Sequence, residues 1–348
     1  MRMTLSEIAA SLQVSPATVS IVRSGKPGVS PFTRRRIQMK LEENGYAYKE
    51  YIVPGSNMPS AQQPGWLKKQ IRLLKFYQSS LLTDKNDGFV DAIIDAVCAY
   101  AQAGGYAVLF SSVSQEDYPG VLEQLREDTC DGLLVLATEM SREEILQLES
   151  LPMPVVILDS DHPGLPFSCV TMDNRDIAYQ ALMYLFSLGT RDIGYLRSTI
   201  RTGNFVSREH GYAEALRSEH IAPDPALSFD LTPSLTGSYQ DMAAWLRAGR
   251  RVPRALFADN DLLAIGAMRA LLEHGLRVPE DVYLIGVDNT LLSQVSSPTL
   301  SSMQISRSAL GQMAISTLLR QIDAPDGERF HLRVCGHLMI RRSTGGEG

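Results

Sequence analysis

The sequence predicts a small α-helical domain followed by an α/β body, whose two Rossmann-like lobes have a cleft between them. Three observations carry this prediction. Apolar residues recur at helical spacing through the first 46 residues, and a stretch rich in proline, glycine and polar residues follows. From residue 71 onward, short strand-like apolar runs alternate with helical patterns, as in a doubly wound α/β fold.

The beginning of the small domain fits a helix-turn-helix. The first helix is predicted from apolar residues at helical spacing: Leu5, Ile8, Ala9 and Leu12. Ser15 suits an N-cap, and Pro16 suits the first position of a second helix, where its missing N–H costs nothing. Val19 and Val22 then face the first helix. In a helix-turn-helix, the second helix lies in the major groove of DNA.

A third helix is predicted from about Ser30 to Asn44, and Gly45 ends it. Its inward-facing residues are Phe32, Ile37 and Leu41, and its outward-facing residues are Arg34, Arg35 and Arg36. Residues 1–50 hold eight basic and four acidic side chains, whereas the rest of the chain has a net charge of −10. This asymmetry indicates that the small domain alone meets a polyanion. The arginines are either a solvated helix face or phosphate contacts.

Residues 49–69 are predicted to form a linker, because helical periodicity is lost and Pro54, Gly55, Pro64 and Gly65 interrupt the segment.

The first half of the body is predicted to contain alternating strands and helices: strand 71–77, helix 89–103, strand 106–110, helix 118–127, strand 132–136, helix 141–149 and strand 155–159. Strand 106–110 is apolar on both faces, as expected of a buried parallel strand.

The pattern restarts in the second half, after a strand at 169–172 that is predicted to cross between the lobes. The further elements are helix 175–188, strand 193–196, helices 208–218 and 237–248, strand 255–258, helix 261–274, strand 282–287, helix 307–322 and a strand near 330–340. The predicted lobes comprise about 70–171 with 304–326, and about 172–303 with 327–348. Ligands of such sheets bind outside the carboxyl ends of the strands.

The ordered set of motifs resembles the lactose-repressor (LacI/GalR) family of bacterial transcriptional regulators, nearly from end to end. In the small domain the matching residues are Thr4, Ile8, Ala9, Val14, Ser15, Thr18, Val19 and Ser20. In the body they include Asp173–Asn174, Ala258–Asp261, Arg277–Val282, Ile285–Asn289 and Arg341–Ser343. The resemblance implies a homodimeric repressor that binds a double-stranded DNA operator, with a periplasmic-binding-protein-like core that binds a small effector and needs no cofactor.

By their positions in the family motif, nine residues are expected at the DNA: Thr4, Ser15, Pro16, Ala17, Thr18, Ser20, Ile21, Arg23 and Arg34. Thr18 is also expected to pack inside the helical unit. Pro16 and Ala17 stand where the family usually contacts base edges, and they offer only apolar contact to a thymine methyl group. Ile21 replaces the usual arginine, and Arg23 lies two residues further on.

The linker departs further from the family, which has a hinge helix that inserts a leucine into the minor groove. The corresponding segment, Lys49–Gly55, has no such arginine or leucine. Pro54 would break the end of a hinge helix, and Gly55 has no side chain to insert. We therefore predict little or no hinge wedge and no sharp central kink in the DNA.

Five residues are expected at the effector: Phe89, Asp159, Arg208, Asn260 and Asp288. Asp159 and Asp288 end strands, so their carboxylates should project from the carboxyl edge of each sheet. Arg208 can donate a bidentate pair, and Asn260 is expected to face the ligand while Asp261 caps the following helix. This set suits a polyhydroxylated, sugar-like effector, and a purine or an acidic sugar remains an alternative.

Several function classes are disfavoured by what the sequence lacks. No GxSxG, P-loop, HExxH or strand-linked GxGxxG motif is present, so an enzyme is not expected. The histidines and the four cysteines have no metal-ligand spacing, and no run is long and apolar enough to span a membrane. The main alternative is a solute-binding protein for transport, which the helix-turn-helix and the absence of an apolar leader at the first residues disfavour. A cytoplasmic location is therefore expected.

Overall fold

The computed structural model describes most of the chain. The described residues are 3–12, 14–24, 26, 29, 33, 37, 40–41, 44, 46, 69–78 and 89–347. The chain divides into two compact units, Met1–Pro64 and Gly65–Gly348. We describe each unit by itself.

The first unit contains the predicted helix-turn-helix. Helix α1 (Leu5–Ser11) and helix α2 (Pro16–Arg23) pack through a cluster of buried side chains, Ile8, Ala9, Val19, Val22, Ile37 and Leu41. Ser15 is the N-cap of α2, and its Oγ accepts a hydrogen bond from the Thr18 amide at 3.1 Å. Pro16 occupies the first helical position, as predicted.

The third predicted helix is described at residues 33, 37, 40, 41 and 44, of which the first four are helical and Asn44 lies in a turn. Ile37 and Leu41 are fully buried, which agrees with their predicted inward position. Phe32, Arg34, Arg35, Arg36 and the segment 49–68 lie outside the described residues, so the predictions for the basic face, the linker and the hinge stay predictions.

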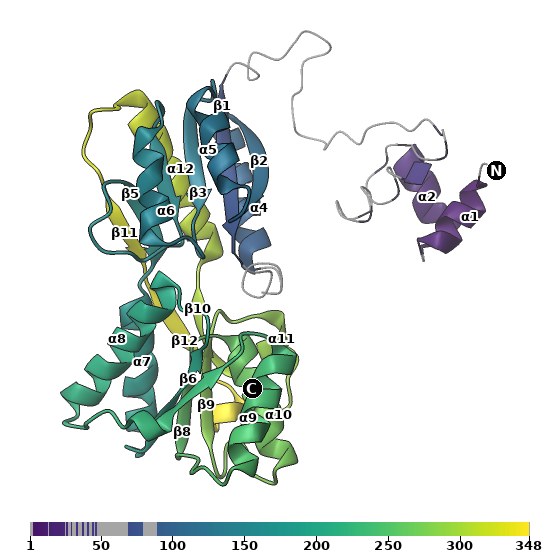
Figure 1. Ribbon diagram of the computed structural model, residues 1–348. Helices are drawn as coiled ribbons and strands as arrows, with labels where there is room; N and C mark the ends of the chain where they lie inside the picture. Colours follow the sequence, from purple (N-terminus) through teal and green to yellow (C-terminus); the bar gives the residue numbers. More distant parts are fainter. Residues whose placement is uncertain are drawn as a thin grey trace. The chain divides into compact units, whose positions relative to one another are not determined.

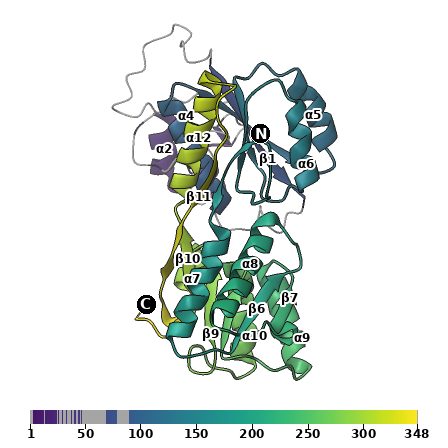
Figure 2. The same cartoon turned by 90° about the vertical axis from the view of Figure 1, so that its left-hand side faces the viewer.

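The second unit consists of two α/β lobes (Figure 1). The sheet of lobe 1 has the strand order β11-β5-β4-β3-β1-β2, and all of its pairs are parallel. Its strands are β1 (Gln70–Tyr77), β2 (Ala107–Ser114), β3 (Gly132–Leu136), β4 (Val155–Leu158), β5 (Ser168–Met172) and β11 (His331–Val334). One face is covered by α4 (Phe89–Ala103) and α12 (Arg307–Asp323), the other by α5 (Tyr118–Arg126) and α6 (Arg142–Leu146) (Figure 2).

The sheet of lobe 2 has the order β12-β10-β9-β8-β6-β7, in which only β12 is antiparallel to its neighbour. Its strands are β6 (Ile193–Ser198), β7 (Ser228–Leu231), β8 (Ala255–Ala258), β9 (Tyr283–Val287), β10 (Ser301–Ile305) and β12 (Gly336–Met339). Helices α7 (Asn174–Ser187) and α8 (Gly203–Ser218) cover one face, whereas α9 (Leu235–Arg247) and α10 (Asp261–Glu273) cover the other. Shorter helical elements are α11 (Leu291–Val295), η2 (Gln147–Ser150), η3 (Pro225–Leu227) and η4 (Arg342–Thr344).

The chain crosses between the two lobes at three described points, which are residues 173, 306 and 335. The predicted strand 330–340 is therefore two strands. Residues 331–334 pair with β5 of lobe 1, so the prediction that they belong to lobe 2 was wrong. Strands β11 and β12 follow each other in the chain but belong to different sheets. This is possible because each is an edge strand, which pairs with a neighbour on one side only. The strand predicted to cross, 169–172, lies wholly within lobe 1.

Among the helices and strands, β7, β10 and α11 were not predicted, and neither were the short 3-10 helices η3 and η4. Strand β10 begins with two serines and α11 is a single turn, so neither has a hydrophobic period that marks it. Strand β2 was expected to be buried but is an edge strand, and it exposes Leu109 and Phe110. In the described part of the chain, no helix is long and apolar enough to cross a membrane.

Candidate functional site

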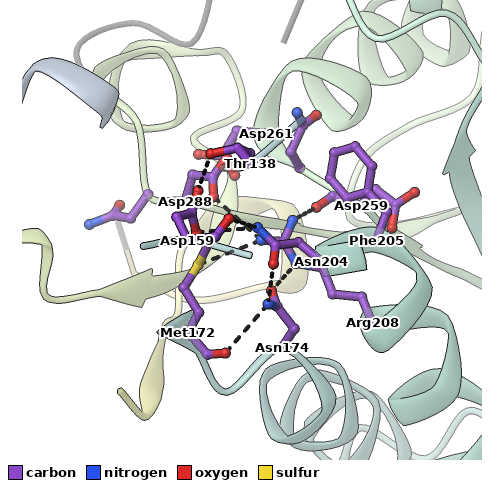
Figure 3. A network of polar contacts seen from close by, with 12 residues as sticks. Thr138, Asp159, Met172, Asn174, Asn204, Phe205, Arg208, Asp259, Asp261 and Asp288 are labelled. Carbon is purple, nitrogen blue, oxygen red and sulfur yellow. Dashed lines mark hydrogen bonds and ion pairs between the residues drawn. The ribbon is translucent and has the colours of Figure 1, made fainter. Parts of the chain in front are cut away.

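A buried polar network lies where strands of both lobes end (Figure 3). Asp159 follows β4 of lobe 1, Asp288 follows β9 of lobe 2, and Asp259 follows β8. Helix α8 contributes Arg208 and Asn204 from its first two turns. All five residues are buried, and the structure thus brings three of the predicted residues, Asp159, Arg208 and Asp288, into one cluster.

Arg208 is at the centre of this network and is only 2% exposed. Its Nε donates to Asn174 Oδ1 at 2.9 Å, and its Nη1 donates to the carbonyl oxygen of Asp259. Its Nη2 lies 3.6 Å from the sulfur of Met172 and 3.9 Å from Asp288 Oδ1, which is an ion-pair distance beyond a hydrogen bond. The guanidinium is thus held mainly by its hydrogen bonds to Asn174 and to the backbone of Asp259, rather than by the Asp288 carboxylate.

Asp159 links the two lobes. Its Oδ2 accepts a hydrogen bond from Thr138 Oγ1 of lobe 1 at 2.7 Å. The side-chain amide of Asn204, from lobe 2, donates to Asp159 Oδ1 at 3.2 Å and to its carbonyl oxygen at 3.1 Å. The pKa of Asp159 is raised to about 6, chiefly by burial and to a smaller extent by the charge of Asp288, against the lowering effects of Thr138 and Arg208.

Asp288 sits on a strained stretch of backbone. Asp288 and Asn289 both have positive φ, 105° and 48°, a conformation that non-glycine residues rarely adopt. Arg307 Nη2 donates to the carbonyl oxygens of both residues, at 2.5 and 3.4 Å. The Asn289 side chain donates to Gln304 Oε1 at 2.8 Å and accepts from Arg341. These contacts hold the turn that presents the Asp288 carboxylate.

Asn260 and Asp261 lie just after the end of strand β8, where one of them caps the next helix. Asn260 is the N-cap of α10, because its Oδ1 accepts from the Leu263 amide at 3.0 Å, so the prediction that Asp261 caps this helix was wrong. Among the described residues, no hydrogen-bond partner is found for the Asn260 amide nitrogen. Asp261 instead accepts hydrogen bonds from the Thr290 amide at 2.7 Å and from Ser302 Oγ at 2.6 Å. Burial, with the charge of Asp288, raises the pKa of Asp261 to about 7.

Asp259 is a buried residue that sequence reasoning missed. Its carboxylate accepts hydrogen bonds from the Tyr195 hydroxyl, from the Ser198 amide at 2.8 Å and from Arg201 Nη1 at 3.0 Å. Arg201 also donates to Glu209 Oε2 of α8 at 2.6 Å. The carboxylate thereby fixes the loop before α8, and burial raises its pKa. Asn174 and Asn204 were missed as well, although Asn174 lies within one of the matched motifs.

Phe89 is the first residue of α4, but its side chain lies outside the described residues, so its predicted contact stays a prediction. Among the described side chains, no group of three or more His, Cys, Asp or Glu residues is arranged to hold a metal ion.

The predicted DNA-reading residues lie on α2 and at the start of α1. Ser15, Pro16, Ala17, Ser20 and Arg23 are exposed, whereas Thr18 and Ile21 are partly buried. The Ser15 hydroxyl is engaged with Thr18 through both its amide and its hydroxyl, and the Arg23 guanidinium lies 5.8 Å from the centroid of the Tyr46 ring.

Thr4 belongs to a reciprocal cap at the start of α1. Its amide donates to Glu7 Oε2 at 2.7 Å, and its Oγ1 accepts from the Glu7 amide at 3.3 Å. The Thr4 hydroxyl also donates to Glu7 Oε2 at 2.9 Å, and the two bonds from Thr4 to this carboxylate lower the pKa of Glu7 and fix the first turn of the helix.

The sequence is similar to characterised repressors over nearly its whole length. A periplasmic binding protein-like domain matches residues 182–344. The chain is 27% identical to the HTH-type transcriptional repressor PurR of Aliivibrio salmonicida, covering 98% of both chains. It is 26% identical to the CytR repressor of Escherichia coli, covering 98% of this chain and 96% of CytR. It is also 26% identical to the ribose operon repressor of Haemophilus influenzae, covering 93% of both.

Solved structures agree with this relationship. A complex of the transcriptional regulator CelR with cellobiose has a TM-score of 0.71 and 25% identity, covering 98% of this chain and 100% of CelR. A lac repressor dimer bound to operator and the anti-inducer ONPF has a TM-score of 0.70 and 25% identity, covering 99% of both chains. The relatives are repressors rather than enzymes. The helix-turn-helix, the two-lobed core and these comparisons support the resemblance to the LacI/GalR family, and the chain is a DNA-binding transcriptional regulator similar to its repressors.

Proposed function

We propose that this protein is a homodimeric repressor whose affinity for its operator is controlled by a small, sugar-like effector. The single observation that carries the proposal is the buried network of Asp159, Arg208 and Asp288, which comes from both lobes. Burying such groups costs free energy unless they are paired, so their presence favours a binding role. A ligand held by residues of both lobes favours one arrangement of the lobes. Such a change is how effector binding can alter the affinity of the DNA-binding unit for the operator.

The relatives support an effector of this kind. CelR was solved with cellobiose, and the lac repressor was solved as a dimer with an operator and an anti-inducer. We propose that Asp159, Asn260 and Asp288 accept or donate hydrogen bonds to the effector, with Arg208 holding the network in place. Phe89 is proposed to stack on a flat face of the ligand.

A homodimer is supported by apolar side chains at the surface of both lobes. On lobe 1, Tyr100 lies on α4, and Leu109 and Phe110 lie on the edge strand β2. On lobe 2, Leu291 and Val295 of α11 are 67% and 66% exposed. Exposed edge strands and apolar patches are the surfaces that partner chains cover. A two-fold dimer would carry two α2 helices, which suits a pseudo-palindromic operator in the cytoplasm.

Transport of a solute is the weaker alternative. The core alone would suit a solute-binding protein, but the similarity to repressors includes the helix-turn-helix. The amphipathic packing of α1 and α2, with an exposed face on α2, has no part in transport.

The test is a gel shift with the full-length protein and the DNA upstream of its own gene. We expect a salt-dependent complex whose affinity changes when a sugar from a screened panel is added. Absence of any sequence-specific complex would contradict the proposed function. A complex that no small molecule affects would contradict the effector part alone.

A further inference from the structure

A pocket of about 290 Å³ lies in lobe 1, at the edge of the sheet where β4 and β5 begin. It is lined from both sides of the sheet, since Leu148 of η2 and Gln321 of α12 contribute to its walls. Asp159 follows the other end of β4, so the pocket is separate from the polar network described above. We call it the proline pocket, because four of its lining residues are Pro152, Pro154, Pro166 and Pro325.

The linker segment joins lobe 1 at this same edge. Strand β1 begins at Gln70, whose carbonyl oxygen accepts a hydrogen bond from the Asp131 amide at 2.8 Å. On the other side of β3, the Leu133 amide donates to the Pro154 carbonyl oxygen at 2.9 Å. The start of β1 and the wall of the pocket are therefore two strand spacings apart, about 10 Å. Extended chain between Trp66 and Gln70 spans up to about 13 Å, so Trp66 can reach the pocket.

Trp66 has the chemistry that this pocket accepts. The pocket is lined by both apolar and polar side chains, and an indole combines a large apolar body with one N–H donor. Glu149, which is exposed at the pocket, supplies a carboxylate acceptor for this N–H. Proline and aromatic rings pack well on each other, as when Pro-rich peptides bind aromatic-lined grooves. The other tryptophan of the chain, Trp245, already packs against Phe229 and Arg250 in lobe 2.

We propose that the proline pocket is the docking site of Trp66, which anchors the linker on lobe 1 just before β1. Trp66 itself lies outside the described residues. The anchor would lie beside the last turn of α12, which contributes Gln321 to the pocket. The first residue of α12, Arg307, donates to the carbonyl oxygens of Asp288 and Asn289 in lobe 2. A shift of this one helix would therefore act both on the turn after β9 and on the linker that leads to the DNA-binding unit.

The fluorescence of Trp66 tests the proposal in the full-length protein. The substitution Trp245→Phe leaves Trp66 as the only tryptophan of the chain and keeps an aromatic ring beside Phe229. Quenching by acrylamide then measures how accessible the Trp66 indole is to small molecules in solution. We expect quenching to be several-fold weaker in the folded protein than in the same protein unfolded in urea.

Two exposed prolines of the pocket allow the docking site to be changed without altering the core. Pro152→Asp and Pro325→Asp, each combined with Trp245→Phe, place a charge in the pocket wall, and covering that charge with an indole is costly. Each should raise the quenching of Trp66 several-fold, towards the value of the unfolded protein. The matched control, Pro223→Asp, changes an exposed proline of lobe 2 and should leave the quenching unchanged. Circular dichroism shows whether each variant is folded.

Limited proteolysis with trypsin gives a second readout, in which Trp245 is kept. Docking of Trp66 should protect the peptide bond after Lys68, because the protease cleaves a segment only while it is detached. Trp66→Ala, Pro152→Asp and Pro325→Asp should each accelerate cleavage at this bond by about tenfold, with the site identified by mass spectrometry. Pro223→Asp should leave the rate unchanged.

Three outcomes would overturn the inference. The first is a Trp66 indole that is as accessible in the folded protein as in urea. The second is a protected indole whose quenching and whose cleavage at Lys68 are the same in both pocket variants, because Trp66 would then be buried elsewhere. The third is dissociation of a dimer in both pocket variants, measured by sedimentation, with unchanged quenching. That result would assign the pocket to a second copy of the chain.

Discussion

Replacing Asp159 by asparagine is expected to stabilise the protein at alkaline pH. The side chain is 1% exposed, and burial raises its pKa from 3.8 to about 6. Because the pKa in the folded state is above that in the unfolded state, this group favours folding fully below pH 4. That contribution is lost as the pH rises through about 6. Asparagine has no charge to bury, so it avoids this loss.

The size of the effect follows from the pKa difference, which corresponds to about 3 kcal/mol. Asparagine keeps the local contacts, because its Oδ1 can accept from Asn204 and its amide can donate to Thr138 Oγ1. The pKa of about 6 already includes the hydrogen bonds of Thr138 and Asn204 to the carboxylate, so their loss is not subtracted a second time. The positive φ of 58° suits asparagine as well as aspartate. The expected gain at pH 8 is therefore up to about 3 kcal/mol.

Urea unfolding followed by circular dichroism at pH 8 and pH 5 measures this difference. The advantage of Asp159→Asn should be largest at pH 8 and smaller at pH 5. The exposed control Asp326→Asn should change the free energy of unfolding by less than about 0.5 kcal/mol at either pH. A variant that is destabilised by the same amount at both values would refute the reasoning, because it would show that hydrogen bonds outweigh desolvation at this carboxylate.

Four further outcomes are expected. Ser15→Ala removes the N-cap of α2, which should destabilise the first unit by about 1 kcal/mol and weaken gel-shift binding to specific and unspecific DNA alike. Pro16 and Ala17 expose only apolar groups, so we expect them to contact thymine methyl groups of the operator. Replacing these thymines by uracil, which lacks the methyl group, should weaken binding about fourfold for each methyl group contacted, measured by competition. Leu291→Glu should shift the protein from dimer to monomer in analytical ultracentrifugation without altering its circular dichroism. Effector affinity, measured by calorimetry, should fall as the pH drops below about 6, by up to about tenfold per pH unit, because the ligand competes with the proton on Asp159.

Much of the fold was predictable because its elements carry strong local signals. Helix 89–103 and strand 255–258 were predicted with the bounds that the structure has. Strand β8 is buried on both faces, so its uninterrupted apolar run identifies it as a strand. Strand β10 could not be found in this way, because Ser301 and Ser302 are buried through hydrogen bonds with distant partners rather than through apolar packing.

The site was predictable where it depends on strand ends. Asp159 and Asp288 follow parallel strands, and a carboxyl edge is where such side chains gather. Asn204 was missed because α8 was expected near residue 208, whereas Thr202 caps it and the helix begins at Gly203. Asn204 therefore occupies the first turn, aimed at Asp159, a position that the predicted loop did not suggest.

The turn after β9 shows why residue types alone could not describe the site. Holding two non-glycine residues at positive φ costs of order 1–3 kcal/mol each, and a sequence gives no sign of such strain. Asp288 and Asn289 keep this conformation because Arg307 binds both of their carbonyl oxygens. Arg307 begins α12, which packs in lobe 1, whereas β9 belongs to lobe 2. A displacement of one lobe against the other must therefore alter the bonds that position the Asp288 carboxylate, and by linkage a ligand that fixes this carboxylate restricts the displacement.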